Sequence, residues 1–289
     1  MHKLRLKVPD TSPRRGVGIL AGSGPLPAQV AAAAQARGHD VFVVAFRDFA
    51  ELPLLAPYPH EVFRLAAAGE ILSALKRRGC RELVLIGPVR RPAWRDLRPD
   101  GEGARILARL GRAIFLGDDG LLGAVVRVLG EEGFVVRGAH EFLQNATGHS
   151  GALGRVAPDM QARADIARGV SVLRTMAQLD IGQGCVVQNG LVLAVEALEG
   201  TDAMLGRCGS LMQAGSGGVL VKMPKQGQDL RADMPTIGPE TLENAARNGL
   251  RGVAFQPGVT LLTDPVRCIA QADRYGLFLY GLTTDDLKE

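Results

Sequence analysis

The sequence predicts an α/β protein whose two halves differ in design. In the first half, an apolar run at 17–21 is followed by a glycine turn, an alanine-rich segment at 28–37 and a second apolar run at 41–45. This strand–turn–helix–strand order is typical of a Rossmann-like unit with a parallel sheet. In the second half, Asn189-Gly190 joins two apolar runs, which is a strong signal for an antiparallel hairpin. We therefore expect a parallel-sheet domain followed by a mixed-sheet α/β domain.

The first half continues with further helices and strands. The amphipathic segment at 66–78 predicts a helix, and the apolar run at 82–86 predicts a third strand. Residues 103–115 and 121–129 are expected to be helical, and 134–137 to form a fourth strand. All of these strands are short apolar runs, as expected for strands that are buried on both faces of a parallel sheet.

The second half begins with a long helix and the hairpin, and then alternates between strands and helices. Asp159 follows a proline and is a good N-cap for the first of these helices. The expected order is helix 159–179, strands 184–188 and 190–195, helix 199–212, strand 218–222, helix 239–248, strand 252–255, helix 264–275 and strand 277–280.

A change in composition marks the expected domain boundary. Residues 141–158 are rich in glycine, serine, asparagine and threonine, which is typical of a connecting loop. We therefore expect an N-terminal domain at 1–140, a linker at 141–158 and a C-terminal domain at 159–289. The active site is expected in the cleft between the two domains.

The bulk composition is that of a soluble globular protein. Of the 289 residues, 46% are hydrophobic and 22% charged, with a net charge of +4. This small basic excess favours anionic ligands, whereas an aromatic content of 4% argues against nucleic-acid binding by base stacking. No apolar run approaches the roughly 18 residues of a membrane span, and the N-terminus lacks a secretory signal.

The cysteines indicate a reducing compartment. Cys80, Cys185, Cys208 and Cys268 are scattered and form no CxxC pair, so neither a zinc site nor a disulfide framework is expected. We expect free thiols and a cytoplasmic location.

The glycine turn at 22–24 lies where a phosphate could meet a helix N-terminus. It is only a partial dinucleotide fingerprint, because Pro27 stands where the third glycine belongs. Phe46-Arg47 also stands where an acidic residue would bind a ribose. A different anionic group is therefore favoured over NAD or FAD. An oxidoreductase is one alternative, and a turn that merely needs positive φ is another.

Two apolar runs in the second half end in clusters of charge. The run at 191–195 precedes Glu196 and the segment 199–202, and the run at 218–222 precedes the segment 225–238. Strand ends are where α/β folds place ligand groups. Carboxylates beside Lys and Arg suit a magnesium ion together with a phosphate. Solvated turn charges are the alternative interpretation, and capping of the next helix is the alternative for Asp118 and Asp119.

Several blocks together resemble a known family. They are ILAGSGPLP at 19–27, GPVRRP at 87–92, GDDGLL at 117–122, VVQNGLVLAVEALEGTDAML at 186–205 and KMPKQGQDLRADMPTIGPETL at 222–242. In this combination the chain resembles the magnesium-dependent UDP-2,3-diacylglucosamine pyrophosphatases of the lipid A pathway, the soluble type that is unrelated to calcineurin-like enzymes. The resemblance runs from about residue 16 to 282.

The resemblance implies a function and a set of partners. It implies two α/β domains with the substrate between them, and hydrolysis of UDP-2,3-diacylglucosamine to UMP and 2,3-diacylglucosamine 1-phosphate by water attack on the α-phosphorus. Mg²⁺ is the implied cofactor. Because the substrate is a lipid, we expect transient contact with the cytoplasmic face of the inner membrane. A homodimer through the second domain is a further hypothesis, and a non-catalytic nucleotide-sugar or lipid-binding protein is the other alternative.

The residue patterns and the resemblance lead to the same candidate residues. The expected catalytic residues are Asp233, Asp229, Arg231 and Lys222, with Asp233 leading as metal ligand or water-positioning group. The expected metal ligands are Asp233, Asp229, Glu196, Glu199, Asp202 and Asp119. The expected substrate contacts are Gly22, Ser23, Gly24, Pro25, Arg90, Gln188, Thr201, Gln228, Thr236 and Ile237.

Overall fold

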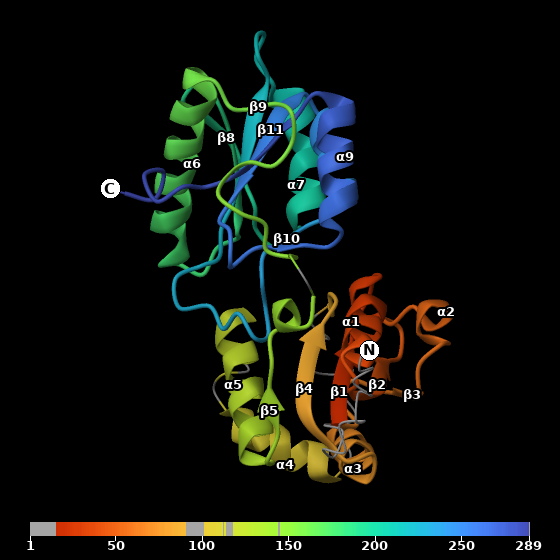
Figure 1. Cartoon of the computed structure of the whole chain (residues 1–289). Coiled ribbons are helices and arrows are strands. Elements are labelled where there is room, and N and C mark those ends of the chain that lie inside the picture. The colour runs from red at the N-terminus through yellow and green to blue at the C-terminus, as the bar shows by residue number, and fades with distance from the viewer. Residues whose placement is uncertain (1–15, 91–100, 112, 114–117, 144, 289) are drawn as a thin grey trace, which may run out of the picture. The chain divides into compact units, whose positions relative to one another are not determined.

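The computed structural model describes residues 16–90, 101–111, 113, 118–143 and 145–288, with the backbone alone at 118 and 119 (Figure 1). Contacts divide the chain into two compact units. One consists of the chain up to Arg105 together with Glu131–Val136, and the other of Ile106–Gly130 together with Arg137–Glu289. Each unit is built around its own sheet, as the sequence predicts.

The sheet of the first unit has five strands in the order β3-β2-β1-β4-β5, all parallel. They are β1 (Gly16–Ala21), β2 (Asp40–Phe46), β3 (His60–Phe63), β4 (Cys80–Ile86) and β5 (Val135–Val136). Every residue of β1 is buried, because neighbouring strands and helices cover it on all sides. The predicted Rossmann-like parallel sheet is confirmed.

Helices pack against this sheet through short apolar side chains. α1 (Leu26–Ala36) contacts β1 and β2, and buries Val30, Ala31 and Ala34. α3 (Ala68–Arg77) contacts β4 and buries its leucine and isoleucine face. The four-residue α2 (Leu52–Leu55) connects β2 and β3 along the chain.

The order of the strands places a switch point between β1 and β4. The loops after these two strands approach closely: a Cβ on Gly22 would lie 2.2 Å from the Gly87 carbonyl oxygen. Gly87 has φ +91, and a Cβ there would lie 2.5 Å from the Ser23 carbonyl oxygen. Both positions therefore require glycine. Ligands of open α/β sheets bind at such a switch point.

The sheet of the second unit has six strands in the order β6-β13-β11-β9-β7-β8. The strands β9, β11 and β13 are parallel, whereas β6, β7 and β8 each run antiparallel to their neighbours. The bounds are β6 (Gly151–Ala152), β7 (Gly184–Gln188), β8 (Leu191–Val195), β9 (Gly218–Lys222), β11 (Leu250–Phe255) and β13 (Phe278–Gly281). β10 (Thr236–Ile237) and β12 (Leu261–Leu262) form a separate parallel pair. The predicted mixed sheet is confirmed.

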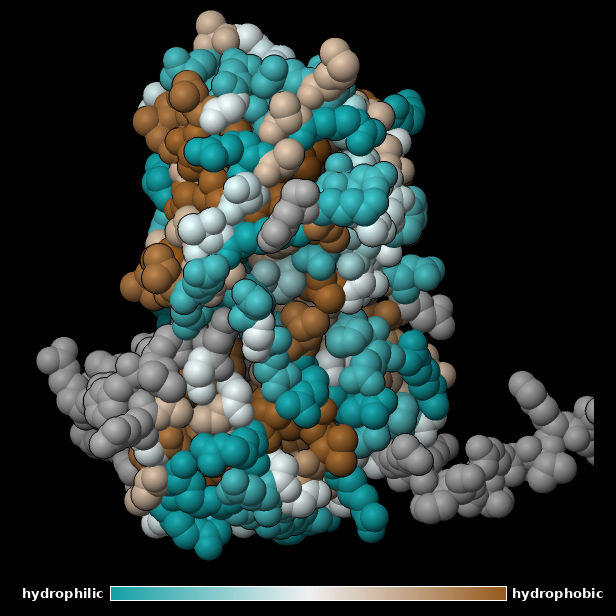
Figure 2. Space-filling view, turned by 90° about the vertical axis from the view of Figure 1, so that its left-hand side faces the viewer, coloured by the Kyte–Doolittle hydropathy of each residue, from teal (hydrophilic) through white to brown (hydrophobic). Residues whose placement is uncertain are grey.

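Helices cover both faces of this sheet. On one side, α6 (Met160–Ala177) packs through Ile166 and Val170 against β7 and β9. On the other side lie α7, α8 and α9, which share one apolar core with the sheet (Figure 1). Their bounds are α7 (Thr201–Cys208), α8 (Pro239–Arg247) and α9 (Pro265–Tyr275). The surface on the α6 side carries apolar groups between polar ones (Figure 2).

Two more helices and two short 3₁₀ turns also lie in the described residues. α4 (Gly101–Leu110) and α5 (Asp118–Glu131) share a small apolar cluster around Leu110, Ala124 and Val128. The 3₁₀ turns are η3 (Ala139–Glu141) and η4 (Gly209–Leu211). In the part of the chain that the structure describes, no helix has both the length and the apolar character needed to cross a bilayer.

Several predicted bounds need correction. The helix expected at 199–212 begins at Thr201, because Gly200 has φ +82, and it ends in η4. The helix expected at 103–115 spans Gly101–Leu110. The sequence analysis missed α2, β3, β6, β10 and β12, because segments of two to four residues are too short to show a period.

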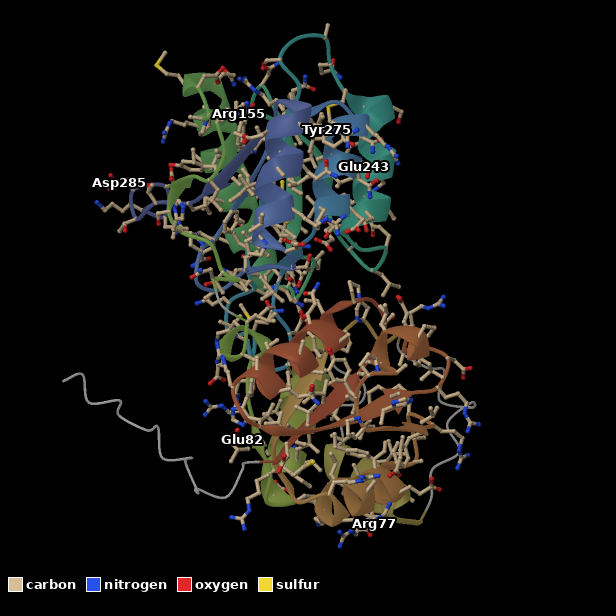
Figure 3. All side chains as sticks on the ribbon, turned by 45° about the vertical axis from the view of Figure 1, so that its right-hand side comes forward. Arg77, Glu82, Arg155, Glu243, Tyr275 and Asp285 are labelled. Atoms are coloured by element: carbon tan, nitrogen blue, oxygen red, sulfur yellow. The ribbon has the colours of Figure 1, made fainter. Side chains whose placement is uncertain are left out.

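The segment expected to be a linker is attached to the second unit. It contains β6, which pairs with β13. Arg155, labelled in Figure 3, is held by Asp273 of α9, whose carboxylate accepts from the Arg155 backbone N–H (2.7 Å) and contacts its guanidinium (3.2 Å). The boundary expected at 141–158 stays a prediction.

The thiols are free, as expected. Cys80, Cys185, Cys208 and Cys268 are all buried and form no disulfide. Burial raises the pKa of Cys185 and of Cys268 to about 12, so their reactive thiolate forms are scarce at neutral pH.

A buried carboxylate holds the hairpin turn in place. Asp165 of α6 is 1% exposed, and it accepts from the backbone N–H groups of Asn189 (3.0 Å) and Gly190 (2.7 Å). Both turn residues have positive φ, which confirms the turn predicted from Asn-Gly. The carboxylate thus joins α6 to the hairpin.

We expect Asp165→Ala to lower the free energy of unfolding by about 2–3 kcal/mol, because the N–H groups of Asn189 and Gly190 would lose their charged acceptor. Chemical denaturation measures this change. Asp285→Ala is the control, since that side chain is 85% exposed and should change stability by less than about 0.5 kcal/mol. Equal effects of the two variants would contradict the prediction.

Candidate active site

Three segments meet at one edge of the second sheet. Lys222 ends β9, and Gly184, which begins β7, pairs directly with it. β8 runs back to the same edge, where Val195 pairs with Cys185. Gln183, Glu196 and the loop after β9 therefore come together at this edge.

Lys222 is the buried cation of the edge. It is 6% exposed, and its ammonium donates to Thr201 Oγ1 (2.6 Å) and to the Thr236 carbonyl oxygen (2.9 Å). Burial lowers the pKa of Lys222, while the carboxylates of Glu196, Asp202 and Asp233 act in the opposite direction. The surrounding carboxylates thus favour the charged form of Lys222 and oppose the effect of burial on its pKa.

Glu196 is linked to this lysine through a hydroxyl. Thr201 Oγ1 donates to Glu196 Oε1 (2.9 Å) while it accepts from the Lys222 ammonium. The other oxygen, Oε2, is buried and has no hydrogen-bond partner among the described residues. A buried polar atom without a partner indicates a place where a ligand, ion or water binds.

Asp233 is held by two amides. Its Oδ2 accepts from the Nε2 groups of both Gln183 (3.1 Å) and Gln228. Gln228 is 8% exposed, so one of the two amides is itself part of the protein interior.

Asp229 has a different environment. Its two oxygens accept from Arg231 Nε (2.9 Å) and Nη2 (2.7 Å), and its Oδ1 also accepts from the Arg231 backbone N–H (3.1 Å). The hydrogen bonds from Arg231 hold the pKa of Asp229 below its ordinary value. This closed pair leaves Asp229 less suited than Asp233 to bind an ion or a proton. Arg231 itself is half-exposed.

Two other expected metal ligands contact protein groups at the rim of the site. Glu199 Oε1 accepts from Arg207 Nη2 (2.8 Å), and that bond lowers the pKa of Glu199. Asp202 is exposed and accepts from Asn244 Nδ2 (3.0 Å). The side chain of Asp119 lies outside the described residues.

The expected substrate contacts fall into separate groups. Thr201 and Thr236 lie beside Lys222, and Ile237 is fully buried in the adjacent core. Gln188 lies at the opposite end of β7, where its amide bonds to the backbone of Gln213 (2.9 and 2.8 Å). The structure therefore does not bring Gln188 together with Lys222.

In the first unit, the glycine turn lies at the switch point of the parallel sheet. Gly22 N–H donates to the Ile86 carbonyl (2.9 Å), and Ser23 N–H donates to the Pro88 carbonyl (3.0 Å). Gly24 N–H donates to a carboxylate oxygen of Glu51 (3.1 Å). Only the Gly24 group faces an anion, and that anion is a side chain of the protein itself.

Two further candidates of the first unit lie on the surface. Pro25 is exposed and directly precedes α1, and Arg90 is exposed in the loop after β4. Both are accessible to a ligand. Their role in substrate binding stays a prediction.

The donor set of the second unit suits a magnesium ion in part. Across the described ranges, no three His, Cys, Asp or Glu side chains are arranged as a metal site. Magnesium, however, is typically held by one or two carboxylates together with substrate phosphates. Glu196, with its unpartnered buried oxygen, and Asp233 meet that smaller requirement.

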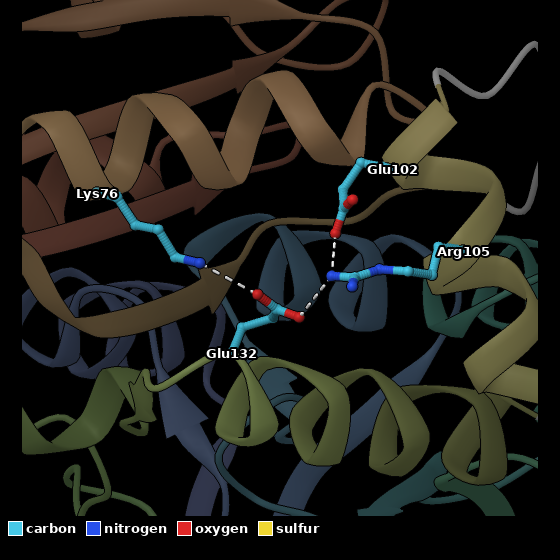
Figure 4. Close-up of polar contacts among 4 residues, drawn as sticks. All are labelled: Lys76, Glu102, Arg105 and Glu132. Atoms are coloured by element: carbon cyan, nitrogen blue, oxygen red, sulfur yellow. Dashed lines mark hydrogen bonds and ion pairs between the residues drawn. The ribbon is translucent and has the colours of Figure 1, made fainter.

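A cavity of about 720 Å³ in the first unit is a weaker candidate. Four of its charged side chains already pair with one another (Figure 4): Glu132 contacts both Lys76 (3.1 Å) and Arg105 (3.5 Å), and Arg105 also contacts Glu102. These pairs leave little net charge for an anionic ligand. The edge around Lys222 is therefore the stronger candidate for the active site.

Gln183 is the residue that the sequence analysis missed. It is uncharged and precedes a strand, so a search for charged clusters passes over it. The sequence offers one hint, the glycine that precedes it. In the structure Gly182 has φ +56, and a Cβ there would lie 1.9 Å from the Glu196 carbonyl oxygen. A glycine under this constraint marks a place where two backbones meet.

Comparison with known proteins covers almost the whole chain. Residues 16–146 match the model of the LpxI N-terminal domain, and residues 149–280 match that of the LpxI C-terminal domain. The chain is 43% identical over 274 residues to the UDP-2,3-diacylglucosamine pyrophosphatase LpxI of Caulobacter vibrioides. This match spans 93% of the chain and 98% of that protein.

The close approach at Gly182 leads to a stability prediction. We expect Gly182→Ala to be about 1–3 kcal/mol more destabilising than Gly227→Ala, as measured by chemical denaturation. Gly227 also has positive φ (+82), but a Cβ there would meet no atom within 4 Å, so its variant reports backbone strain alone. Equal losses of unfolding free energy in the two variants would contradict the prediction, because the contact of the new Cβ with Glu196 would then be relieved without a cost in stability.

Proposed function

Because this chain belongs to the LpxI family, we propose that it hydrolyses the pyrophosphate bond of UDP-2,3-diacylglucosamine, giving UMP and 2,3-diacylglucosamine 1-phosphate. The observation that carries the proposal is the buried Lys222 ammonium, which lies among the carboxylates of Glu196, Asp202 and Asp233. Cleavage of a phosphoanhydride needs both a cation for the phosphate oxygens and a base for the attacking water.

Lys222 is the proposed phosphate ligand. An ammonium has three N–H donors, and the bonds to Thr201 and Thr236 use two of them. The third is available for a phosphate oxygen. Because Lys222 is fixed by its neighbours, the charge is in place before the substrate arrives, which is the condition for electrostatic catalysis.

Asp233 is the proposed base. Water attacks the α-phosphorus, a new P–O bond forms, the bond to the bridging oxygen breaks, and Asp233 accepts the proton of the water. The diacylglucosamine 1-phosphate leaves with the bridging oxygen. Asp229 is not the first choice for this role, because both of its oxygens are engaged by Arg231.

We propose Mg²⁺ as the cofactor, with Glu196 as its leading protein ligand, because the free oxygen of Asp233 is assigned to the attacking water. When bound, the ion would neutralise phosphate charge and lower the pKa of a coordinated water. The unpartnered Glu196 Oε2 supports this assignment. Glu199 and Asp202 remain candidates for hydrogen bonds at the rim, and the metal-ligand role of Asp119 stays a prediction.

The glycine turn is the proposed phosphate contact of the first unit. Gly24 N–H precedes α1, where the helix dipole favours an anion, and it already binds a carboxylate. We propose that a substrate phosphate takes the place of Glu51 there. Arg90, in the exposed loop after β4, is the proposed second contact.

We also propose that the protein works in the cytoplasm and touches the membrane surface only transiently. Three exposed apolar side chains support this: Leu198 is 97% exposed, Leu179 68% and Ile181 37%. Ile181 and Leu198 flank the paired ends of β7 and β8, close in sequence to Gln183 and Glu196. Such groups suit contact with acyl chains. A homodimer through the second unit stays a hypothesis.

The hydrolase proposal is tested by product release in oxygen-18 water. We expect UMP that carries the heavy oxygen when the protein is incubated with UDP-2,3-diacylglucosamine and Mg²⁺, and a loss of turnover with chelator. Asp233→Ala should lower kcat by at least about 100-fold and leave binding largely intact. Substrate binding without release of UMP would instead indicate a non-catalytic binding protein. Label in the sugar phosphate would overturn the site of attack.

The membrane proposal is tested by co-sedimentation with anionic vesicles at low salt. We expect Leu198→Ser to weaken vesicle binding about tenfold, because it removes an exposed apolar side chain of some 1.5–3 kcal/mol in transfer free energy. Val266→Ser is the matched control, since Val266 is also exposed (78%) but lies in the first turn of α9, away in sequence from β7 and β8. Wild-type protein that stays in the supernatant would contradict the proposal.

A further inference from the structure

Two uncharged side chains from different segments bind the same oxygen of Asp233. Gln183 precedes β7, and Gln228 lies in the loop after β9. Each directs its Nε2 group to Asp233 Oδ2. Among the described residues, no hydrogen bond reaches the other oxygen, Oδ1.

The orientation of the Gln228 amide follows from its second contact. Its Oε1 accepts from the backbone N–H of Lys225 (2.9 Å), and a backbone N–H can only donate. The Nε2 end must therefore face Asp233. The Gln228 backbone N–H also donates to the Lys225 carbonyl (3.3 Å), so the turn that carries the amide is closed on itself.

Gln183 is fixed through its backbone. Its carbonyl oxygen accepts from Met223 N–H (3.0 Å), which places it beside the end of β9. The preceding Gly182 lies against the backbone of Glu196, where no larger residue fits without movement. Both amides thus come from backbone segments that are held at the edge where Lys222 and Glu196 lie.

Neutral donors affect a carboxylate differently from a charged donor. Asp229, which Arg231 contacts on both oxygens, has its pKa lowered and has no free side. Two amides on one oxygen of Asp233 fix its orientation while they leave the other oxygen and the negative charge available. This is the arrangement that a group needs when it must bind a water or an ion.

We propose that Gln183 and Gln228 are positioning residues that fix Asp233 through Oδ2 and direct Oδ1 towards the attacking water or the ion. The proposal rests on the proposed hydrolase function. It changes the expected role of Gln228 from a substrate contact to a support of Asp233, and it adds Gln183, which carries no charge.

Gln183→Met and Gln228→Met test the proposal, because each keeps the side-chain volume and removes the amide donor. We expect either variant to lower kcat for UMP release about 10- to 100-fold, with KM changed less than about threefold, since loss of a supporting hydrogen bond acts on the reacting group. Gln226→Met is the matched control: Gln226 is exposed in the same loop, and we expect both constants to stay unchanged.

A second measurement shows whether the amides act through Asp233. In an Asp233→Ala background, we expect Gln183→Met to cause no further loss, because coupled residues are not additive. A further loss of about tenfold would assign Gln183 a separate role and overturn the proposal. The proposal would also be overturned if kcat fell only in proportion to the fraction of folded protein, as measured by thermal unfolding.

The outcomes separate this proposal from the proposed function. Wild-type kcat in both glutamine variants, together with inactive Asp233→Ala, would reject the positioning role and leave the hydrolase intact. No UMP from the wild-type protein would reject the hydrolase itself, and the positioning role with it. The two glutamines come from different segments, so if one variant does not fold, the other still tests the positioning role.

Discussion

The site of the second unit depends on the burial of one ammonium group at the end of a strand. Taking the Lys222 charge out of water is costly, and the cost is offset only where carboxylates and hydrogen-bond acceptors surround it. Thr201 and Thr236 supply the acceptors, and Glu196, Asp202 and Asp233 supply the negative charge. The start of α7, the pair β10–β12 and the loop after β9 are therefore all tied to one position in β9.

The loop after β9 also shows how similar residues take different tasks. Asp229 and Asp233 are four residues apart, and the sequence places both among the expected catalytic residues and metal ligands, with Asp233 leading. Arg231 binds both oxygens of the first, while two amides bind one oxygen of the second. The difference lies in the partner rather than in the acid. The arginine engages both oxygens of its carboxylate in an ion pair, whereas the amides leave one oxygen of theirs available for a ligand.

Sequence signals that depend on neighbouring residues predicted the main strands, helices and turns well. The Asn189-Gly190 turn, the strand Gly218–Lys222 and the Asp159 cap were all readable, because each depends on neighbours in the sequence. The place of Gln188 was harder to predict: β7 is five residues long, and only the strand's direction puts Gln183 rather than Gln188 beside Lys222. The short strands β6, β10 and β12 were not predicted for a related reason, because they exist only through pairing with distant segments.

The contact between Glu51 and Gly24 has a consequence for ligand affinity. An anion that approaches this N–H group meets a tethered competitor, whose local concentration does not change when the solution is diluted. The measured dissociation constant then exceeds the intrinsic one by a factor set by the fraction of time that the tethered group is bound. If a substrate phosphate binds this N–H group as proposed, it must displace Glu51, and a ligand with further contacts would do so more readily than a simple anion.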